Sequence, residues 1–225
     1  MGKMNWRALA CAAAVGLAVA APASAGTVTF EDVTPNLFGN GESFTSGGFS
    51  FKVGGDFGGV DSSAGFFYPA PLGSDGQFYT GLNDSAVTMT AGNGLWSRIH
   101  GFDFSFVSPF PLGPTMSPGA LVAMGIDSAG AAFTQIWDFG DSDANGDFGF
   151  RTIDVSTLGA LSGFVKSVTF LACLYDGNGF CVNPASNQAQ FSIDNIHAEL
   201  PEPASLALVI GALGLLGATR RKQSI

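Results

Sequence analysis

Basic residues are scarce in the long central part of this 225-residue chain. The segment 26–202 contains all 18 acidic residues of the chain, but its only basic residues are Lys52, Arg98, Arg151 and Lys166. Its formal charge is therefore −14, whereas the whole chain carries −9 because the other five cations lie at its ends. Nucleic-acid binding depends on cations that neutralise phosphates, so this composition argues against nucleic acid as a partner. It favours solubility and attracts divalent cations.

Side chains typical of catalytic centres are also few. The two histidines, His100 and His197, are not spaced as metal ligands in the manner of H-E-x-x-H. The chain contains no G-x-S-x-G motif. We therefore predict that the protein is not an enzyme. A hydrolase with paired carboxylates stays open as an alternative, because acidic residues are plentiful.

Helical periodicity is nearly missing between residues 26 and 200, and apolar residues alternate with polar or small ones instead. Such alternation occurs at 49–53, 101–107, 121–127, 167–173 and 190–200. Roughly nine or ten short strands separated by Gly, Pro, Asn and Asp are typical of an all-β domain. We predict an antiparallel β-sandwich of jelly-roll type, with an immunoglobulin-like sandwich as the alternative. All 21 phenylalanines lie in this segment and can supply its core.

The alternation also assigns side chains to faces of the strands. In 121–127, it places Val122, Met124 and Ile126 on one face, opposite small residues. In 190–200, it places Phe191, Ile193, Asn195 and His197 on one face.

Apolar runs of appreciable length occur only at the two ends. At the N-terminus, Lys3 and Arg7 precede an apolar run over 8–21, and Ala23-Ser24-Ala25 follows as an A-x-A cleavage site. This order predicts a secretory signal helix over 1–25, removed by signal peptidase. The alternative is a retained transmembrane helix, but the run is short and ends at Pro22.

The C-terminal segment 201–225 has three parts. Pro201-Glu202-Pro203 ends the domain, because proline cannot continue a strand ladder. Residues 204–219 are uncharged and form a short apolar run, slightly below the ~20 residues that a spanning helix needs. Arg220, Arg221 and Lys222 follow, and clustered cations favour the cytoplasmic side. A short transmembrane helix is predicted here, with the domain 26–200 outside.

These three parts together resemble the PEP-CTERM sorting signal of Gram-negative bacteria. The stretch containing Gln190, Phe191 and Asp194 is similar to the QFxxD signature of one group of such proteins. The resemblance implies export across the inner membrane and processing by an exosortase, so that the membrane is contacted only transiently. It also implies a final location at the cell surface or in the extracellular matrix, with a role in exopolysaccharide, biofilm or floc formation.

Two cysteines remain after the signal peptide. Cys173 and Cys181 flank Asp176-Gly177-Asn178-Gly179, which is typical of a hairpin turn. They stand at nearly matched positions on either side of the turn, so a disulfide is predicted in an oxidising compartment. The alternative is two unpaired buried thiols.

Two groups of oxygen ligands are candidates for structural calcium. If the terminal strands lie side by side, Glu31 and Asp32 approach Asp194. This arrangement resembles jelly-roll carbohydrate-binding modules, in which a first strand with "FE" and a last strand with "IDNI" share a calcium ion. The alternative is that Asp194 and Asn195 cap or bond to neighbouring loop backbone.

The second calcium candidate is the loop with Asp141, Asp143 and Asn145, which matches the opening D-x-[DN]-x-[DN]-G of a calcium loop. The twelfth position is Thr152 rather than the Glu that closes such a loop. The alternative is a solvated acidic loop between two strands.

Aromatic side chains are candidates for stacking on sugar rings. The candidates are Tyr68, Trp96 and Trp137, and Tyr68 stands in a Gly- and Pro-rich segment that is typical of a loop. Core packing is the competing interpretation for each of them. The working hypothesis is a secreted matrix protein that contacts polysaccharide, with a secreted polysaccharide hydrolase or a surface protein without a ligand as alternatives.

Overall fold

In the computed structural model, the described residues are 25–65, 70–74, 76–92, 96–109, 117–154, 157–182 and 188–200. Ala25–Leu200 form one compact unit built from antiparallel strands, which confirms the all-β prediction. Among the described residues, the one helix is the short 3-10 turn η1 (Gly159–Ser162), and none could cross a membrane. The predicted signal helix and C-terminal helix lie outside the described residues.

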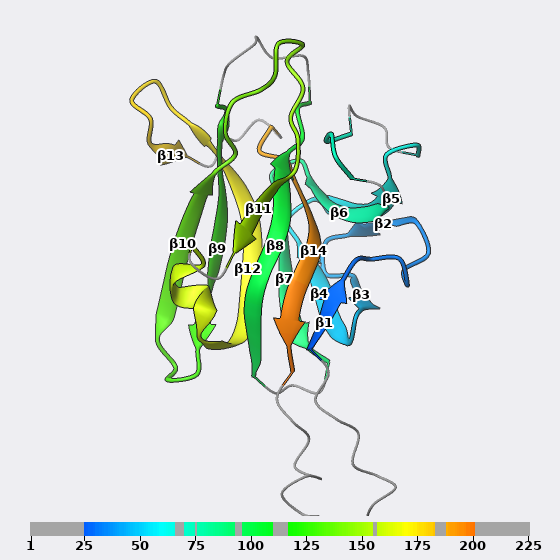
Figure 1. Ribbon diagram of the computed structural model, residues 1–225, viewed down its shortest axis with the longest axis vertical. Coiled ribbons are helices and arrows are strands. Elements are labelled where there is room, and N and C mark those ends of the chain that lie inside the picture. Colours follow the sequence, from blue (N-terminus) through cyan, green and yellow to red (C-terminus); the bar gives the residue numbers. More distant parts are fainter. Residues whose placement is uncertain are drawn as a thin grey trace, which may run out of the picture. The chain divides into compact units, whose positions relative to one another are not determined.

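Hydrogen bonds join fourteen strands into one sheet, which folds over on itself into two layers (Figure 1). The first layer has the order β11-β8-β14-β6-β5-β2, with β1 beside β14. Its strands are β1 (Ala25–Val28), β2 (Asn36–Gly39), β5 (Phe57–Ser62), β6 (Gln77–Leu82), β8 (Ser97–Phe106), β11 (Arg151–Asp154) and β14 (Phe191–Glu199).

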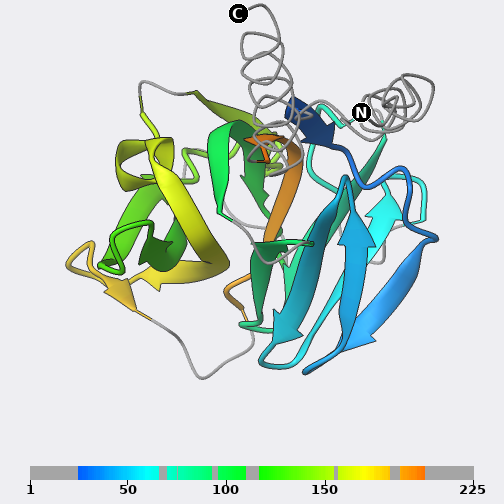
Figure 2. The ribbon, with the colours of Figure 1, turned by 90° about the horizontal axis from the view of Figure 1, so that it is seen from below.

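The second layer has the order β10-β9-β12-β7-β4-β3, with β13 beside β12. Its strands are β3 (Ser43–Ser46), β4 (Phe49–Gly54), β7 (Ala86–Ala91), β9 (Gly119–Asp127), β10 (Ala132–Asp138), β12 (Phe164–Tyr175) and β13 (Cys181–Val182). The layers join at one end, where Phe164 and Val165 of β12 pair with Arg98 and Ser97 of β8. Figure 2 shows this arrangement along the strands.

Phenylalanine fills the space between the layers. The fully buried aromatic side chains of this core are Phe30, Phe49, Phe51, Tyr79, Phe102, Phe104, Phe170 and Phe191. Phe102 of β8 contacts Trp137 of β10 and Phe170 of β12 edge-on, with ring centroids 5.3 and 5.4 Å apart. Such edge-to-face pairs add to the gain from burial, so the aromatic contacts hold the two layers together.

The alternation predicted for β9 is present, and the face with Met124 and Ile126 is the exposed one. Leu121 and Ala123 are fully buried, whereas Met124 and Ile126 are 41% and 43% exposed. The inner side leaves little room, because a side chain at Gly125 would meet the Phe133 ring. Val122, Met124 and Ile126 therefore share a face as predicted, and it is the outer face of the second layer.

The face assigned to the end of β14 is wrong beyond Ile193. Asn195 adopts a left-handed conformation with φ of 49°, and the pairing with β8 shifts register between Asp194 and His197. This bulge moves the pattern by one residue, because an extra residue reverses the alternation of side chains. Ile196 is consequently buried and His197 exposed.

Candidate functional site

The carboxylates of the first calcium candidate bind backbone and side-chain donors in three different places. β1 pairs with β14, as the prediction required. Glu31 accepts hydrogen bonds from the backbone N–H (2.6 Å) and side-chain amide (3.3 Å) of Gln77. Asp32 accepts from the Ser46 hydroxyl and from the Gly47 N–H at 3.0 Å. Asp194 accepts from the N–H of Asn195 at 2.7 Å.

These bonds give Glu31 and Asp32, in the segment after β1, a structural role. Glu31 ties the chain to β6, and Asp32 ties it to the hairpin of β3 and β4. Burial raises the pKa of Asp32, but the bonds from Ser46 and Gly47 outweigh it and hold that pKa below its usual value. Both carboxylates therefore join separate parts of the domain, whereas the backbone bonding expected for Asp194 agrees with its bond from the Asn195 N–H.

The second calcium candidate is one of three loops with the same internal bonding. The loops are 127–131, 143–147 and 176–180, and each begins with Asp and has a glycine of positive φ at its fourth position. In each, one oxygen of the first Asp accepts from the N–H groups two and four residues later, at 2.8–2.9 Å. A local hydrogen-bonding role therefore accounts for the D-x-x-G pattern.

These bonds also lower the pKa values of two loop aspartates. The N–H groups of Asp147 and Asn145 lower the pKa of Asp143. The N–H groups of Phe180 and Asn178 do the same for Asp176. Asp141 precedes the loop, is exposed and takes no part in these bonds. In the part of the chain that is described, no three His, Cys, Asp or Glu residues gather as metal ligands, and calcium binding stays a prediction.

The three predicted sugar platforms have different positions. Trp137 is only 8% exposed, and its indole N–H donates to the carbonyl of Thr157 at 3.0 Å. Core packing is therefore the correct interpretation for Trp137, because its ring is enclosed by Phe102 and the segment before η1. Trp96 is half-buried just before β8. Tyr68 lies outside the described residues.

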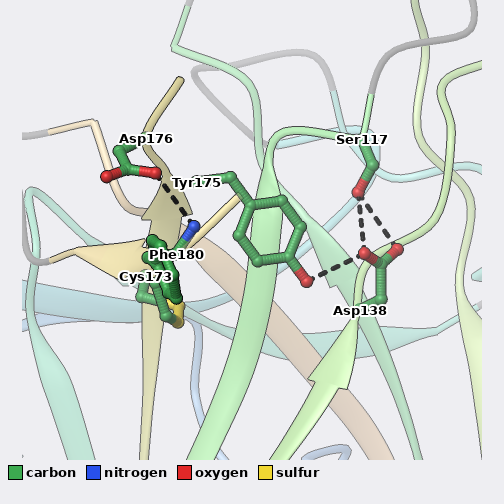
Figure 3. The surroundings of a disulfide bond; sticks show 7 residues. Ser117, Asp138, Cys173, Tyr175, Asp176 and Phe180 are labelled. Carbon is green, nitrogen blue, oxygen red and sulfur yellow. Dashed lines mark hydrogen bonds between the residues drawn. A yellow bond between two sulfur atoms is a disulfide. The ribbon is translucent and has the colours of Figure 1, made fainter. Parts of the chain in front are cut away.

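The predicted disulfide between Cys173 and Cys181 is confirmed (Figure 3). It links β12 to β13 across the turn that begins at Asp176, and its Cα atoms are 5.4 Å apart. Cys173 belongs to a small apolar cluster with Ala120 and Val122, separate from the main core. The bond therefore braces a hairpin on the outer face of the second layer.

Phe180 ends the turn of this braced hairpin, directly before Cys181, and is 69% exposed, the highest value among the large hydrophobic residues identified as exposed. Its N–H donates to Asp176 at 2.9 Å, and its carbonyl accepts from the Asp176 N–H, also at 2.9 Å. The backbone is thus held by the turn and by the neighbouring disulfide. Figure 1 shows the hairpin projecting from the end of the sheet. Sequence analysis missed Phe180, although its position between a turn and a bridged Cys was a usable signal.

A polar group lies beside the base of the hairpin. The Tyr175 hydroxyl donates to Asp138 Oδ2 at 2.9 Å, and the Ser117 hydroxyl contacts both carboxylate oxygens of Asp138 at 3.0 and 3.1 Å (Figure 3). Arg151 Nη1 donates to the Asp138 carbonyl at 3.0 Å and lies 3.9 Å from the carboxylate. The Asp138 side chain is about half exposed (48%), so it can also accept bonds from a ligand.

Tyr175 provides a test of this geometry. Burial, the hydrogen bond to Asp138 and the negative charge of Asp138 together raise the pKa of Tyr175 from 10.0 to about 12. The folded state keeps this proton where the unfolded state loses it, so the contribution of Tyr175 to stability is complete below pH 10 and lost as pH rises toward 12. Ultraviolet titration of tyrosinate in the parent and in Tyr175→Phe isolates this residue. In Asp138→Asn, the Tyr175 titration is expected to move back toward 10; an unchanged titration in that variant would contradict the hydrogen bond.

Comparison with known proteins gives structural similarity only. No protein-family model and no curated protein matches the chain. The structure of TmCBM61 in complex with β-1,4-galactotriose is similar over 66% of this chain and 86% of its own, with 10% identity and a TM-score of 0.33. The enzymatically active domain of tailspike protein 4 of bacteriophage CBA120 is similar over 78% of this chain and 20% of its own, with 14% identity and a TM-score of 0.27. At TM-scores this low, neither similarity supports an argument about a ligand.

Proposed function

We propose that the protein is a secreted surface or matrix protein that contacts polysaccharide through the hairpin carrying Phe180. The observation that supports this is a phenyl ring 69% exposed on a backbone held by a disulfide and a hydrogen-bonded turn. Leaving such a ring in water forgoes the gain from burial, so its exposure favours a binding role. A rigid hairpin loses little conformational entropy when it binds.

The polar group beside the hairpin complements the ring. Sugar rings present apolar C–H faces, which pack on aromatic rings, and hydroxyl groups, which donate to carboxylates. The Asp138 side chain offers two oxygen acceptors in a fixed position, because Ser117 and Tyr175 hold it. Hydrogen bonds to ionised acceptors are stronger than those between neutral groups, so Asp138 can orient a sugar that stacks on the hairpin.

The charge of the domain narrows the class of polysaccharide. Residues 26–200 contain 17 acidic and four basic residues, a formal charge of −13. A polymer of uronic acids or sulfated sugars would be repelled at this surface. We therefore propose a neutral polysaccharide as the ligand.

The remaining proposals rest on the sequence. They are export with a signal peptide, exosortase processing at the PEP-CTERM segment 201–225, and a role in an exopolysaccharide matrix such as a biofilm or floc. A jelly-roll arrangement, structural calcium and the absence of enzymatic activity belong to the same group. The C-terminal residue of protein recovered from the matrix tests the processing, because mature protein that still contains Arg220 would contradict it.

Replacing Phe180 by alanine tests the binding proposal. The variant is expected to bind a neutral polysaccharide such as hydroxyethylcellulose roughly tenfold more weakly, as measured by affinity electrophoresis, because one aromatic stacking contact is lost. Phe164→Ala is the matched control: Phe164 is 40% exposed at the other end of β12, and its loss should leave binding unchanged.

Four results would count against the proposal or redirect it. Equal weakening by Phe164→Ala would show a nonspecific effect. Retention by anionic alginate but not by the neutral polymer would contradict the charge argument. Retention by neither polymer would favour a surface protein without a glycan ligand, and release of reducing ends from either would favour the hydrolase alternative.

A further inference from the structure

The edge strands of the sheet differ in length. Among the described strands, six pair with a single neighbour: β1, β2, β3, β10, β11 and β13. Five of them have two to four residues, whereas β10 has seven, Ala132–Asp138. Short edge strands are one way in which proteins prevent unwanted strand pairing, and β10 is the exception in this sheet.

β10 also lacks the residue types that protect an edge, although the segment 157–159 lies against its Gln135 and Trp137 side chains. It contains no proline and no lysine or arginine, and its one charged residue, Asp138, is the last. The backbone groups of residues 132–137 that face away from β9 have no hydrogen-bond partner within the described part of the chain. β10 is therefore open to a further strand along most of its length (Figure 1).

An exposed apolar surface runs beside this open edge. Ile136 of β10 is 49% exposed, and Met124 and Ile126 of β9 are 41% and 43% exposed. They lie on the outer face, because Thr134 pairs with Met124 and Ala132 with Ile126. Neighbouring apolar side chains of this kind mark interaction surfaces when no other part of the protein covers them.

We propose that β10 pairs in antiparallel orientation with β10 of a second copy of this chain. A two-fold axis near Thr134 or Gln135 brings identical edges together, so every contact occurs twice and the two apolar surfaces form one continuous stripe. The orientation follows from Asp138. Antiparallel pairing places each Asp138 near Ala132 of the other copy, whereas parallel pairing would set the two carboxylates side by side.

The acidic charge of the domain predicts how this dimer responds to salt. Two copies with formal charges of −13 over residues 26–200 repel each other. Added salt screens this repulsion, whereas strand pairing and apolar contact are little affected. The dimer is therefore expected to strengthen as ionic strength rises, and it would present two Phe180 hairpins to a polymer.

Sedimentation of the full chain at several concentrations and salt levels tests the proposal. Thr134→Lys introduces a charge in the middle of β10 and is expected to raise the dimer dissociation constant at least roughly tenfold. Thr45→Lys makes the same change in charge at an exposed position of the edge strand β3, so its dissociation constant should stay close to that of the parent. A monomeric parent at all concentrations, or equal weakening by both variants, would overturn the proposal.

Spin labels give a readout that does not depend on affinity. Labels at Thr134→Cys, in a Cys11→Ser background, are expected within roughly 20 Å of each other, because this position lies near the two-fold axis. Labels at Ser128→Cys, in the turn 127–131 that precedes β10, should be farther apart than those at Thr134, because this turn lies beyond the end of the paired strands. Similar distances at the two positions would indicate parallel pairing, and no measurable coupling at Thr134 would exclude the β10 interface.

Discussion

Removal of the disulfide, by replacing Cys173 and Cys181 with alanine, is expected to lower the free energy of unfolding by about 2–3 kcal/mol. The bridge closes a loop with a sequence separation of eight, and its loss gives conformational freedom to the unfolded chain. Chemical denaturation at neutral pH measures the change. Affinity for the neutral polysaccharide should also fall, because the hairpin that carries Phe180 is no longer braced and must be ordered on binding.

The parent protein supplies the control for this experiment. A reducing agent should lower the stability of the parent toward that of the double variant and leave the double variant unchanged. If complete reduction of the disulfide left the stability of the parent unchanged, the stabilising role of the disulfide would be contradicted. If the double variant is less stable but binds the polysaccharide as tightly as the parent, the disulfide is not needed for binding.

Replacing Phe102 by alanine is expected to destabilise the domain more strongly, by about 3–5 kcal/mol. Phe102 is fully buried, and its ring contacts Phe104, Trp137 and Phe170 from three strands. Truncation removes this burial and leaves a cavity between the two layers, which their hydrogen-bonded backbone cannot fill. Thermal and denaturant unfolding of the variant measure the loss.

Phe164→Ala serves as the control for this change too. The same atoms are removed, but Phe164 is 40% exposed. Its truncation should therefore lower the free energy of unfolding clearly less than truncation of Phe102 does. Comparable destabilisation by the two variants would contradict the position of Phe102 at the centre of the core. Far-ultraviolet circular dichroism should show that both variants keep their strands at low denaturant.

Several features of the fold could be predicted because they depend on local pattern. Alternation over Phe49, Phe51 and Val53 places all three in the core, as observed. The hairpin and disulfide followed from turn residues between two cysteines, since a tight turn brings its flanks together whatever surrounds it. The face of the end of β14 could not be predicted, because the bulge at Asn195 depends on pairing with β8, which is distant in the sequence.

The candidate site was predicted in part. The motifs that suggested calcium contain aspartates that bond to loop backbone, and that bonding appears only when the loop closes. Trp137 was selected as an exposed aromatic, yet its ring is enclosed between strands. Phe180 was passed over, although it is the aromatic side chain that the hairpin exposes.

By itself, the sequence determined the strand-forming alternation, the acidic charge of the domain and the cysteine pair, because each depends on residue type and near neighbours. Only the tertiary structure decided which face of each strand is covered. The outward position of Met124 and Ile126, the enclosure of Trp137 and the open edge of β10 all follow from which strands pack together. Burial is a property of the packed pair of layers, and one strand's pattern cannot specify its partner.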